Sequence, residues 1–384
     1  MRGKRILTFS CVILGLSGIL GCSQSDSASS SPESVIPFSN VEASNTSQPI
    51  LPPHGGWTVP NHKIDSGCLG RRFGTYTWDM SYFRAGNVDL INLLESEVGR
   101  LYACGDLYLN VADYSSPDVI PDADRLIDFV KEFRVKISNP EAIVYLTYGD
   151  VTARDGAAMI TFTHTFFDWA MSISATDAAL MGKIGISFDV EHINPEDSKA
   201  ALLLCQELRS KTVFGQNLSI QHTIDGDRNI LSTEYVFRYA DSALAMLYSN
   251  RPDGLLDLIE WLLTTQCEKC LLDDYARTNY KAKISIILEA SCKMGRGCSD
   301  KSMCVRDNES EGMMYIAETV DEANRLLGAS GLLTLEQFTR LFNLNTQWVV
   351  HNFEWERCFA PFNKYFNYES CKDYHQYAKS CREL

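Results

Sequence analysis

The sequence is short of positive charge and lacks the glycine-rich loops that bind phosphate. It has 35 Lys and Arg against 49 Asp and Glu, for a formal net charge of −14. An acidic chain repels phosphate backbones, so we expect no nucleic-acid partner and a neutral or cationic ligand instead. No dinucleotide fingerprint follows any expected strand, which argues against a nucleotide-binding doubly wound sheet. The His and Cys spacings complete no metal pattern, and we predict no metal and no cofactor.

The chain also lacks an apolar run of the roughly 20 residues that a membrane span needs. The shorter run at 6–20, "ILTFSCVILGLSGIL", follows a basic start and precedes small residues, as in an export signal. We predict a signal peptide at 1–22 and a secreted protein. A start-anchor is one alternative. A lipid anchor at Cys22 is another, although Leu20 stands where lipoproteins usually have a smaller residue.

Cysteine usage supports export. Of 13 Cys residues, most lie beyond residue 60, where an oxidising compartment would pair them. We expect at least four disulfides there, with Cys205 as the buried free thiol of an apolar helix. Residues 23–60 are rich in Ser and Pro and predict a flexible stalk. Sequons at three asparagines indicate a glycoprotein: Asn45, Asn217 and Asn308.

From residue 68 to 357, eight β-rich runs alternate with stretches of helical apolar spacing. This alternation predicts an α/β fold, a single-domain (β/α)8 TIM barrel stapled by disulfides. Residues 358–384 are rich in Cys and aromatics and are expected to pack on the barrel. The eight runs are 72–79, 106–114, 142–150, 183–192, 218–226, 242–250, 283–291 and 346–356.

The fourth run, "KIGISFDVEH", carries two carboxylates on one side of a strand. Successive side chains point to opposite faces, so Ser187, Asp189 and Glu191 should face the barrel interior. Both acids stand near the carboxyl end of the strand, where barrel active sites form. Two neighbouring carboxylates cannot both ionise cheaply, which favours general acid catalysis by one of them. The alternative is a structural pair tied to Arg or Lys.

This strand resembles the strand-four signature of glycoside hydrolase family 18, Asp-Gly-x-Asp-x-Asp-x-Glu. Gly185, Asp189 and Glu191 match, whereas Ile184 and Ser187 replace the first two aspartates.

Later strands extend the resemblance. "MLYSN" is similar to the family's Met-x-Tyr-Asp through Met246 and Tyr248, and Trp355 stands where the family has a tryptophan under the sugar.

The resemblance implies cleavage of β-linked N-acetylglucosamine glycans with retention, assisted by the substrate. Glu191 would protonate the glycosidic oxygen, and the substrate's acetamido carbonyl would attack the anomeric carbon. Asp189 would orient that acetamido group, and Tyr248 would donate a hydrogen bond to it.

Two other functions stay open. Ser187 cannot take a charge from Asp189, so the protein could be a catalytically weak or inactive lectin-like barrel. By strand parity Glu289 also faces inward, which allows a retaining β-glycosidase with Glu191 as acid/base and Glu289 as nucleophile. The bland interpretation of Glu289 is an interior acid hydrogen-bonded to a neighbouring strand.

Several side chains could bind a sugar, because aromatic faces pack against its C–H groups. We expect Trp78, Tyr148 and Trp355 to form this platform, with Met246 and Ser187 lining the site. Plain packing would also explain each aromatic. Three histidines end or line strands and are expected to be structural, with His192 the best placed to assist Glu191: His192, His222 and His351.

Overall fold

The computed structural model describes residues within 73–379, and all of them belong to the unit Pro53–Leu384. The predicted signal peptide and stalk, Glu191 and His192 lie outside the described residues. The described ranges are 73–83, 89–96, 105–113, 115–137, 139–150, 156–190, 193–225, 230–265, 271–272, 278–291, 301–306, 312–351, 353–359, and 362, 371, 372, 374, 376 and 379.

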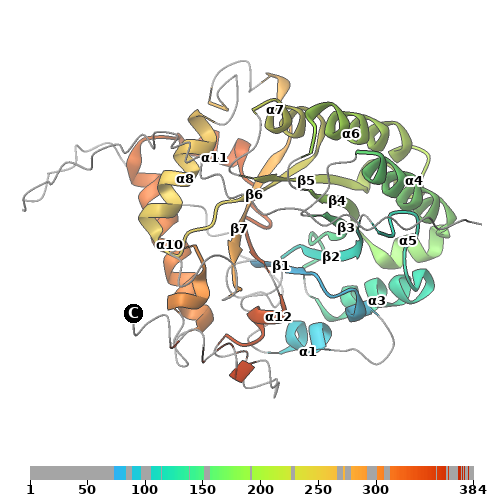
Figure 1. Ribbon diagram of the computed structural model, residues 1–384, viewed down its shortest axis with the longest axis horizontal. Helices are drawn as coiled ribbons and strands as arrows, with labels where there is room; N and C mark the ends of the chain where they lie inside the picture. The colour runs from blue at the N-terminus through green and yellow to red at the C-terminus, as the bar shows by residue number, and fades with distance from the viewer. Residues whose placement is uncertain are drawn as a thin grey trace, which may run out of the picture. The chain divides into compact units, whose positions relative to one another are not determined.

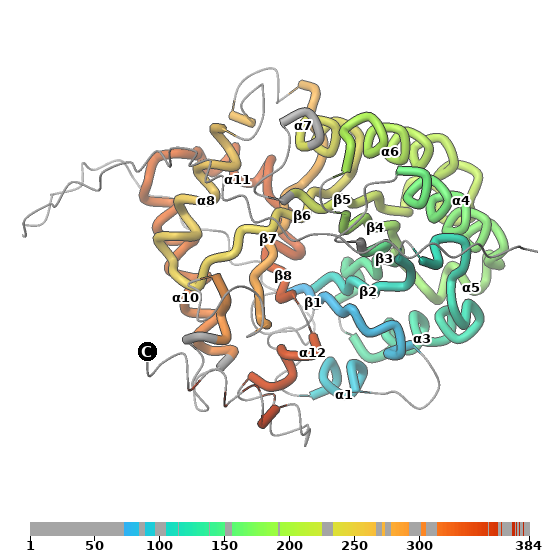
Figure 2. Tube along the Cα trace, in the orientation of Figure 1, coloured from blue at the N-terminus to red at the C-terminus, as the bar shows by residue number. Residues whose placement is uncertain are grey.

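Eight parallel strands close into a barrel in chain order, with β8 between β7 and β1 (Figures 1 and 2). The predicted (β/α)8 barrel is therefore confirmed. The strands are β1 Phe73–Thr77, β2 Leu107–Ala112, β3 Val144–Asp150, β4 Ile184–Val190, β5 Ser219–Asp225, β6 Ser242–Met246, β7 Lys283–Glu289 and β8 Trp348–His351. Each is shorter than its predicted run, and β8 most of all, because a helix begins two residues after it.

Helices surround the strands, with α4, α6 and α7 on one side of Figure 1 and α8 and α10 on the other. Local sequence fixes their starts. Asn194 caps α6 by accepting from the Glu196 backbone N–H at 2.9 Å, and Pro195 occupies the first turn. The α-helices are α1 Asp89–Glu95, α3 Ala123–Lys136, α4 Gly156–Ser172, α5 Ala175–Met181, α6 Pro195–Arg209, α7 Ile230–Tyr239, α8 Pro252–Thr264, α10 Gly312–Ser330, α11 Leu335–Leu341 and α12 Phe353–Glu356, and the 3-10 helices are η1 Met80–Phe83, η2 Gly215–Asn217 and η3 Met303–Arg306.

The core has two layers because strand side chains alternate between the two faces of the barrel. The outer layer fills the space between strands and helices and includes Ile184, Ile186, Phe188 and Val190 of β4, as predicted. A smaller inner cluster fills the barrel: Tyr76, Tyr108, Tyr145, Leu244, Met246, Ile287 and Val349.

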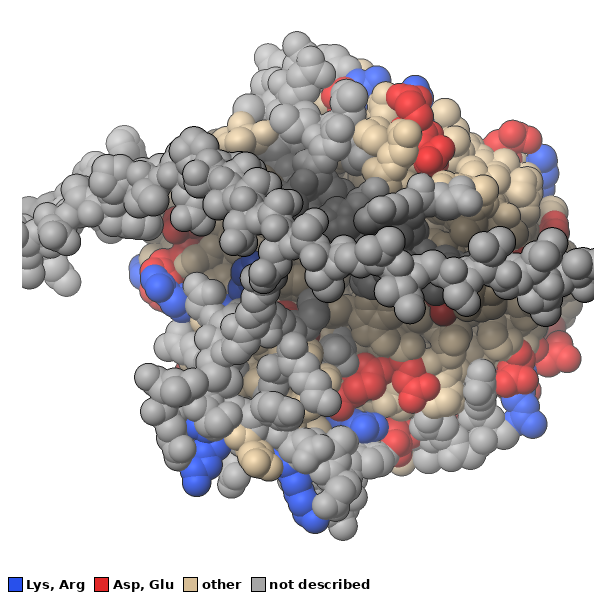
Figure 3. Space-filling model, viewed as in Figure 1, with Lys and Arg blue, Asp and Glu red and all other residues tan. Residues whose placement is uncertain are grey.

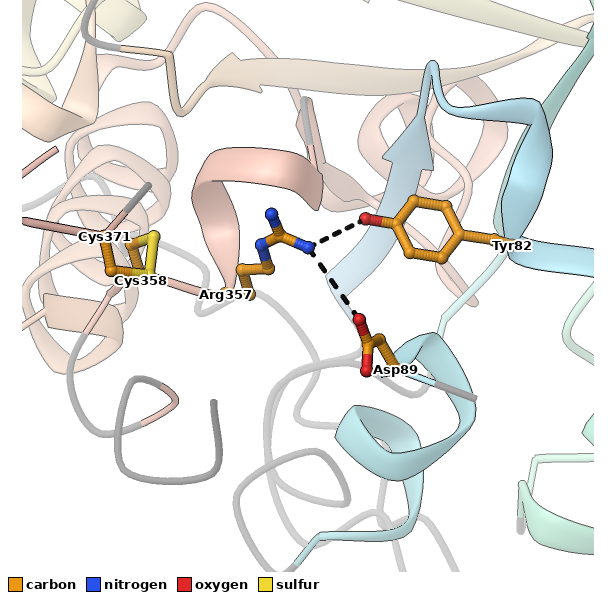
Figure 4. Close-up of a disulfide and its surroundings, with 5 residues drawn as sticks. All are labelled: Tyr82, Asp89, Arg357, Cys358 and Cys371. Carbon is orange, nitrogen blue, oxygen red and sulfur yellow. Dashed lines mark hydrogen bonds and ion pairs between the residues drawn. A yellow bond between two sulfur atoms is a disulfide. The ribbon is translucent and has the colours of Figure 1, made fainter. Parts of the chain in front are cut away.

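The chain after β8 is stapled. Cys358 and Cys371 form a disulfide, and neighbouring Arg357 donates to the Tyr82 hydroxyl at 3.2 Å and pairs with Asp89 at 4.0 Å (Figure 4). Cys205 is free and buried, as predicted. The other expected disulfides fall largely on residues outside those described. None of the described helices combines the length and apolarity that a membrane span requires.

Candidate active site at the carboxyl end of the barrel

Asp189 lies inside the barrel, one residue before the end of β4. It is 3% exposed and lies beside Gly149 of β3 in the strand pairing. The hydroxyl of Tyr76, on β1, has no partner at full hydrogen-bond geometry. It nevertheless lies close enough to the Asp189 carboxylate for the two groups to interact. Burial raises the pKa of Tyr76 well above its ordinary value, and the Asp189 carboxylate raises it further. Tyr76 therefore keeps its proton and presents a polar hydrogen near this carboxylate.

The position that replaces the family's second aspartate is neutral. The Ser187 hydroxyl donates to Oε1 of Gln221 on β5, and both side chains are fully buried. The amide nitrogen of Gln221 is buried without a hydrogen-bond partner among the described residues, which is uncommon for a buried polar atom.

Glu289 has both carboxylate oxygens engaged. Oε2 lies 2.7 Å from Nδ1 of His351, and Oε1 accepts from the Ser291 backbone N–H at 2.5 Å. The residue is 1% exposed. Each oxygen therefore accepts one hydrogen bond, one of them from His351 on the neighbouring strand β8.

His351 continues this chain of contacts to Trp78. The indole Nε1–H donates to Nε2 of His351 at 2.7 Å. Indole nitrogen is only a donor, so Nε2 carries no proton and Nδ1–H donates to Glu289. The rings of Tyr76, Trp78 and Tyr248 all contact His351, with centroids 4.9, 5.7 and 6.3 Å away.

The charge around His351 favours a second proton on the ring. Burial disfavours the imidazolium, but the surrounding carboxylates outweigh burial and raise the pKa of His351 above its ordinary value. These carboxylates belong to Glu289, Asp189 and Glu354. In the space-filling view, acidic side chains gather over the region of α12 and α1 (Figure 3). Acid around an aromatic cluster agrees with a neutral or cationic ligand.

Trp78 is held at its backbone as well. Glu354 of α12 accepts from the Trp78 N–H at 3.2 Å and from the Thr77 hydroxyl at 2.8 Å. The edge of the indole lies against Gly149, where a Cβ atom would come within 2.4 Å of Cζ3. Trp78 as a whole residue is only partly buried.

The structure gathers most of the predicted site residues at this end of the barrel. Met246 belongs to the inner cluster, and Tyr248 lies just beyond β6 and packs on it. With Asp189, Ser187, Glu289 and Trp78, they come from four strands or their ends: β1, β4, β6 and β7.

Two predicted platform residues lie elsewhere. Tyr148 faces the helices and stacks on Phe162 of α4 at 5.5 Å, because it is one residue out of phase with the inward Thr147. Trp355 is on α12, not on a strand, and packs against Tyr374 at 5.6 Å. Glu191 and His192 are outside the described residues, so the separation of Glu191 from Glu289 is not defined.

Sequence reasoning missed the parts played by Tyr76, His351 and Glu354. The chain distance from Trp78 to His351 is 273 residues, so no local pattern could indicate their contact. The available signal was that Glu289 and His351 both end neighbouring strands, where their Cα atoms are register partners. Within the described residues, no group of acids, Cys and His has the arrangement of a metal site.

Comparisons with known proteins give remote similarities. No protein-family model and no curated protein matches the chain. A family 18 chitinase from Pseudoalteromonas aurantia is 13% identical, over 82% of this chain and 99% of that one, with a TM-score of 0.43. The cortex-lytic enzyme SleL of Bacillus megaterium is 12% identical over 58% of this chain and half of that one, at 0.35. A mutant tryptophan synthase α-subunit from Pyrococcus furiosus is 10% identical over 82% and 98%, at 0.38.

The remote resemblance to glycoside hydrolase family 18 is borne out at the level of fold, since a family 18 chitinase and other chitinases are among the similar structures. Barrels with unrelated chemistry are among them too, and such low scores carry no argument about activity. The function has to be argued from the residues at the carboxyl end of the barrel.

Proposed function

We propose that the protein is a secreted glycoside hydrolase of chitinase type that cleaves β-linked N-acetylglucosamine glycans with retention. The observation that carries this proposal is the place of Asp189. It faces the barrel interior at the carboxyl end of β4, the end that also holds Trp78 and Tyr248. Barrel enzymes place their chemistry at this end.

The mechanism assigns one task to each residue. Glu191 protonates the glycosidic oxygen and later takes a proton from water. The substrate's acetamido oxygen attacks the anomeric carbon, and Asp189 orients that group and stabilises the positive oxazolinium. Tyr248 donates a hydrogen bond to the acetamido group, and Trp78 supports the sugar ring.

The contacts of Glu289 weigh against the direct-nucleophile alternative. Its two oxygens already accept from His351 and Ser291, which lowers their nucleophilicity, and the side chain is buried. The lectin-like alternative draws on Ser187, whose partner is the neutral Gln221. Without an acid at 187, charge on Asp189 cannot be shared along β4, and slow turnover is the expected consequence.

The test is hydrolysis of chitotetraose by the wild type, Glu191→Gln and Glu289→Gln, with the product anomer identified by NMR. We expect β-anomer product, and a loss in Glu191→Gln of about 10²–10⁴-fold, as for a positioned general acid. Glu289→Gln should change turnover at saturation only mildly. Glu196→Gln is the matched control, because Glu196 is an exposed acid on the following helix.

Each other outcome selects a different function. Near-complete loss in Glu289→Gln would make Glu289 the nucleophile. Binding without turnover above that of Glu191→Gln would establish the lectin-like barrel. If the wild type neither binds nor cleaves the oligomer, the proposal is wrong.

A further inference from the structure

The contacts from Glu289 to Trp78 join three strands and end on an aromatic ring that is partly buried and packs against the inner cluster. Glu289 is on β7, His351 is on β8, and Trp78 follows β1. The hydrogen bonds from His351 to Glu289 and from Trp78 to His351 are both 2.7 Å long, and His351 is 5% exposed. The two hydrogen bonds run in series from a buried carboxylate to the partly buried Trp78.

The directions of these two hydrogen bonds favour one protonation state of His351, the neutral ring with its proton on Nδ1. Indole can only donate, so Trp78 binds the ring when Nε2 is bare. The carboxylate of Glu289 fixes that form by accepting from Nδ1–H. A second proton on His351 would place two N–H groups face to face and break the contact to Trp78.

Other contacts of Trp78 allow its ring to move without its backbone. Glu354 holds the backbone N–H, and the Asn110 amide donates to the Trp78 carbonyl at 3.4 Å. Among the described residues, the side chain is oriented by the His351 acceptor and by packing against Gly149 and Tyr76. The angle of the indole therefore depends on His351.

We infer that His351 and Glu289 are positioning residues, which hold the Trp78 indole as a flat floor for an uncharged saccharide ring beside Asp189. This rests on the proposed function for the identity of the ligand. Gly149, which the indole touches, is the register partner of Asp189, so a sugar on the indole reaches the carboxylate. Glu289 thus acts on binding through Trp78 and forms no bond to the substrate.

Saccharide binding should depend on pH through the protonation of His351. Groups facing His351 are the carboxylates of Glu289, Asp189 and Glu354 and the phenols of Tyr76 and Tyr248. The phenols do not ionise near neutral pH, and the carboxylates favour the imidazolium. Affinity should fall as the pH is lowered from about 8 to about 5, the range in which histidine changes charge. Stability should not fall through this group, because a raised histidine pKa stabilises the fold at low pH and loses that effect as pH rises.

The experiment joins NMR of the ¹⁵N-labelled indoles to chitotetraose titrations of the full chain. The Trp78 indole signal, assigned with Trp78→Phe, should move with His351 protonation, whereas the Trp355 signal should not. His351→Phe should weaken binding about tenfold, because the indole of Trp78 loses the hydrogen bond that orients it. His351→Gln should restore part of that affinity, since its amide oxygen can accept from the indole. His222→Gln is the control, because His222 is buried on the helix-facing side of β5.

A double-mutant cycle decides the role. In Trp78→Phe, which has no indole N–H, His351→Phe should have no further effect on affinity, and the acid loss of binding should vanish. Additive effects, or a Trp78 signal that ignores pH, would overturn the positioning role. If the Trp78 signal titrates but the wild type binds no saccharide, the proposed function and the ligand platform both fail, while the hydrogen-bonded chain stands.

Discussion

The two ends of the barrel differ in whether their buried polar groups have hydrogen-bond partners. At the amino end Arg134 of α3 donates to three backbone carbonyls, those of Met181, Ala142 and Lys183. Asp106 there accepts from the Ile143 N–H at 2.8 Å, although burial raises its pKa to about 6. At the carboxyl end, beside Trp78, Oδ1 of Asn110 and Oε2 of Glu354 are buried without a hydrogen-bond partner among the described residues.

This difference separates the contacts that stabilise the fold, at the amino end, from the polar groups that can bind a ligand, at the carboxyl end. Each unpaired buried polar atom costs about 1–3 kcal/mol, so a fold built for stability alone would pair it or replace it. Stabilising contacts at the amino end offset that cost. The carboxyl end can then hold Asp189 and its neighbours in an arrangement that a ligand completes.

Among the variants that compare the two ends, Asp189→Asn should have the largest effect, and it changes the carboxyl end alone. Turnover on chitotetraose should fall by about 10²–10³-fold, because the amide cannot stabilise the oxazolinium charge. Unfolding free energy should not fall, since the amide keeps the volume and removes a buried charge. Kinetics and urea unfolding of the same samples measure both. A variant that unfolds easily would instead make Asp189 part of the stabilising framework.

Arg134→Met tests the amino end, with the next largest effect. Three carbonyls lose their donor, so the unfolding free energy should drop by about 3 kcal/mol. Turnover of the folded fraction should stay at the wild-type level because the site is at the other end. Arg125→Met on the same helix is the control, as Arg125 is exposed. Lost turnover at full folding would contradict the division between the two ends.

The sequence predicted the barrel better than the site because the barrel depends on local patterns. Alternation along β4 placed Asp189 and Ser187 inside correctly, and helical spacing separated the strands. Trp355 was assigned to a strand because "FEWE" continues the apolar alternation of β8, although the helix α12 begins at Phe353.

The contacts of the site could not be predicted in the same way. The His351 link to Trp78 exists only once β8 has closed on β1, and closure depends on the whole sheet. The inward-facing Tyr76 was visible from parity, but its nearness to Asp189 across the barrel depends on the barrel's width.

The smallest predicted effect comes from replacing either of two glycines that pack against an aromatic ring. Gly149 lies towards the carboxyl end of its strand and Gly185 towards the amino end of its strand. A Cβ on Gly149 would lie 2.4 Å from Trp78 Cζ3, and one on Gly185 would lie 2.5 Å from Tyr145 Cδ1. Neither ring can stay in place after substitution by Ala, but the rings have different partners. Trp78 is partly buried, whereas Tyr145 is fully buried and its hydroxyl is hydrogen-bonded to Ser219 at 2.9 Å.

We therefore expect Gly149→Ala to weaken chitotetraose binding about tenfold by tilting the indole, with little change in unfolding free energy. Gly185→Ala should instead lower the unfolding free energy by about 1–3 kcal/mol through overpacking, and leave the affinity of the folded protein unchanged. Isothermal titration and urea unfolding of both variants measure the contrast. If Gly149→Ala alters only stability, the Trp78 ring is packing and not a binding surface. Equal losses of affinity in the two variants would show that the two ends of the interior respond as one unit.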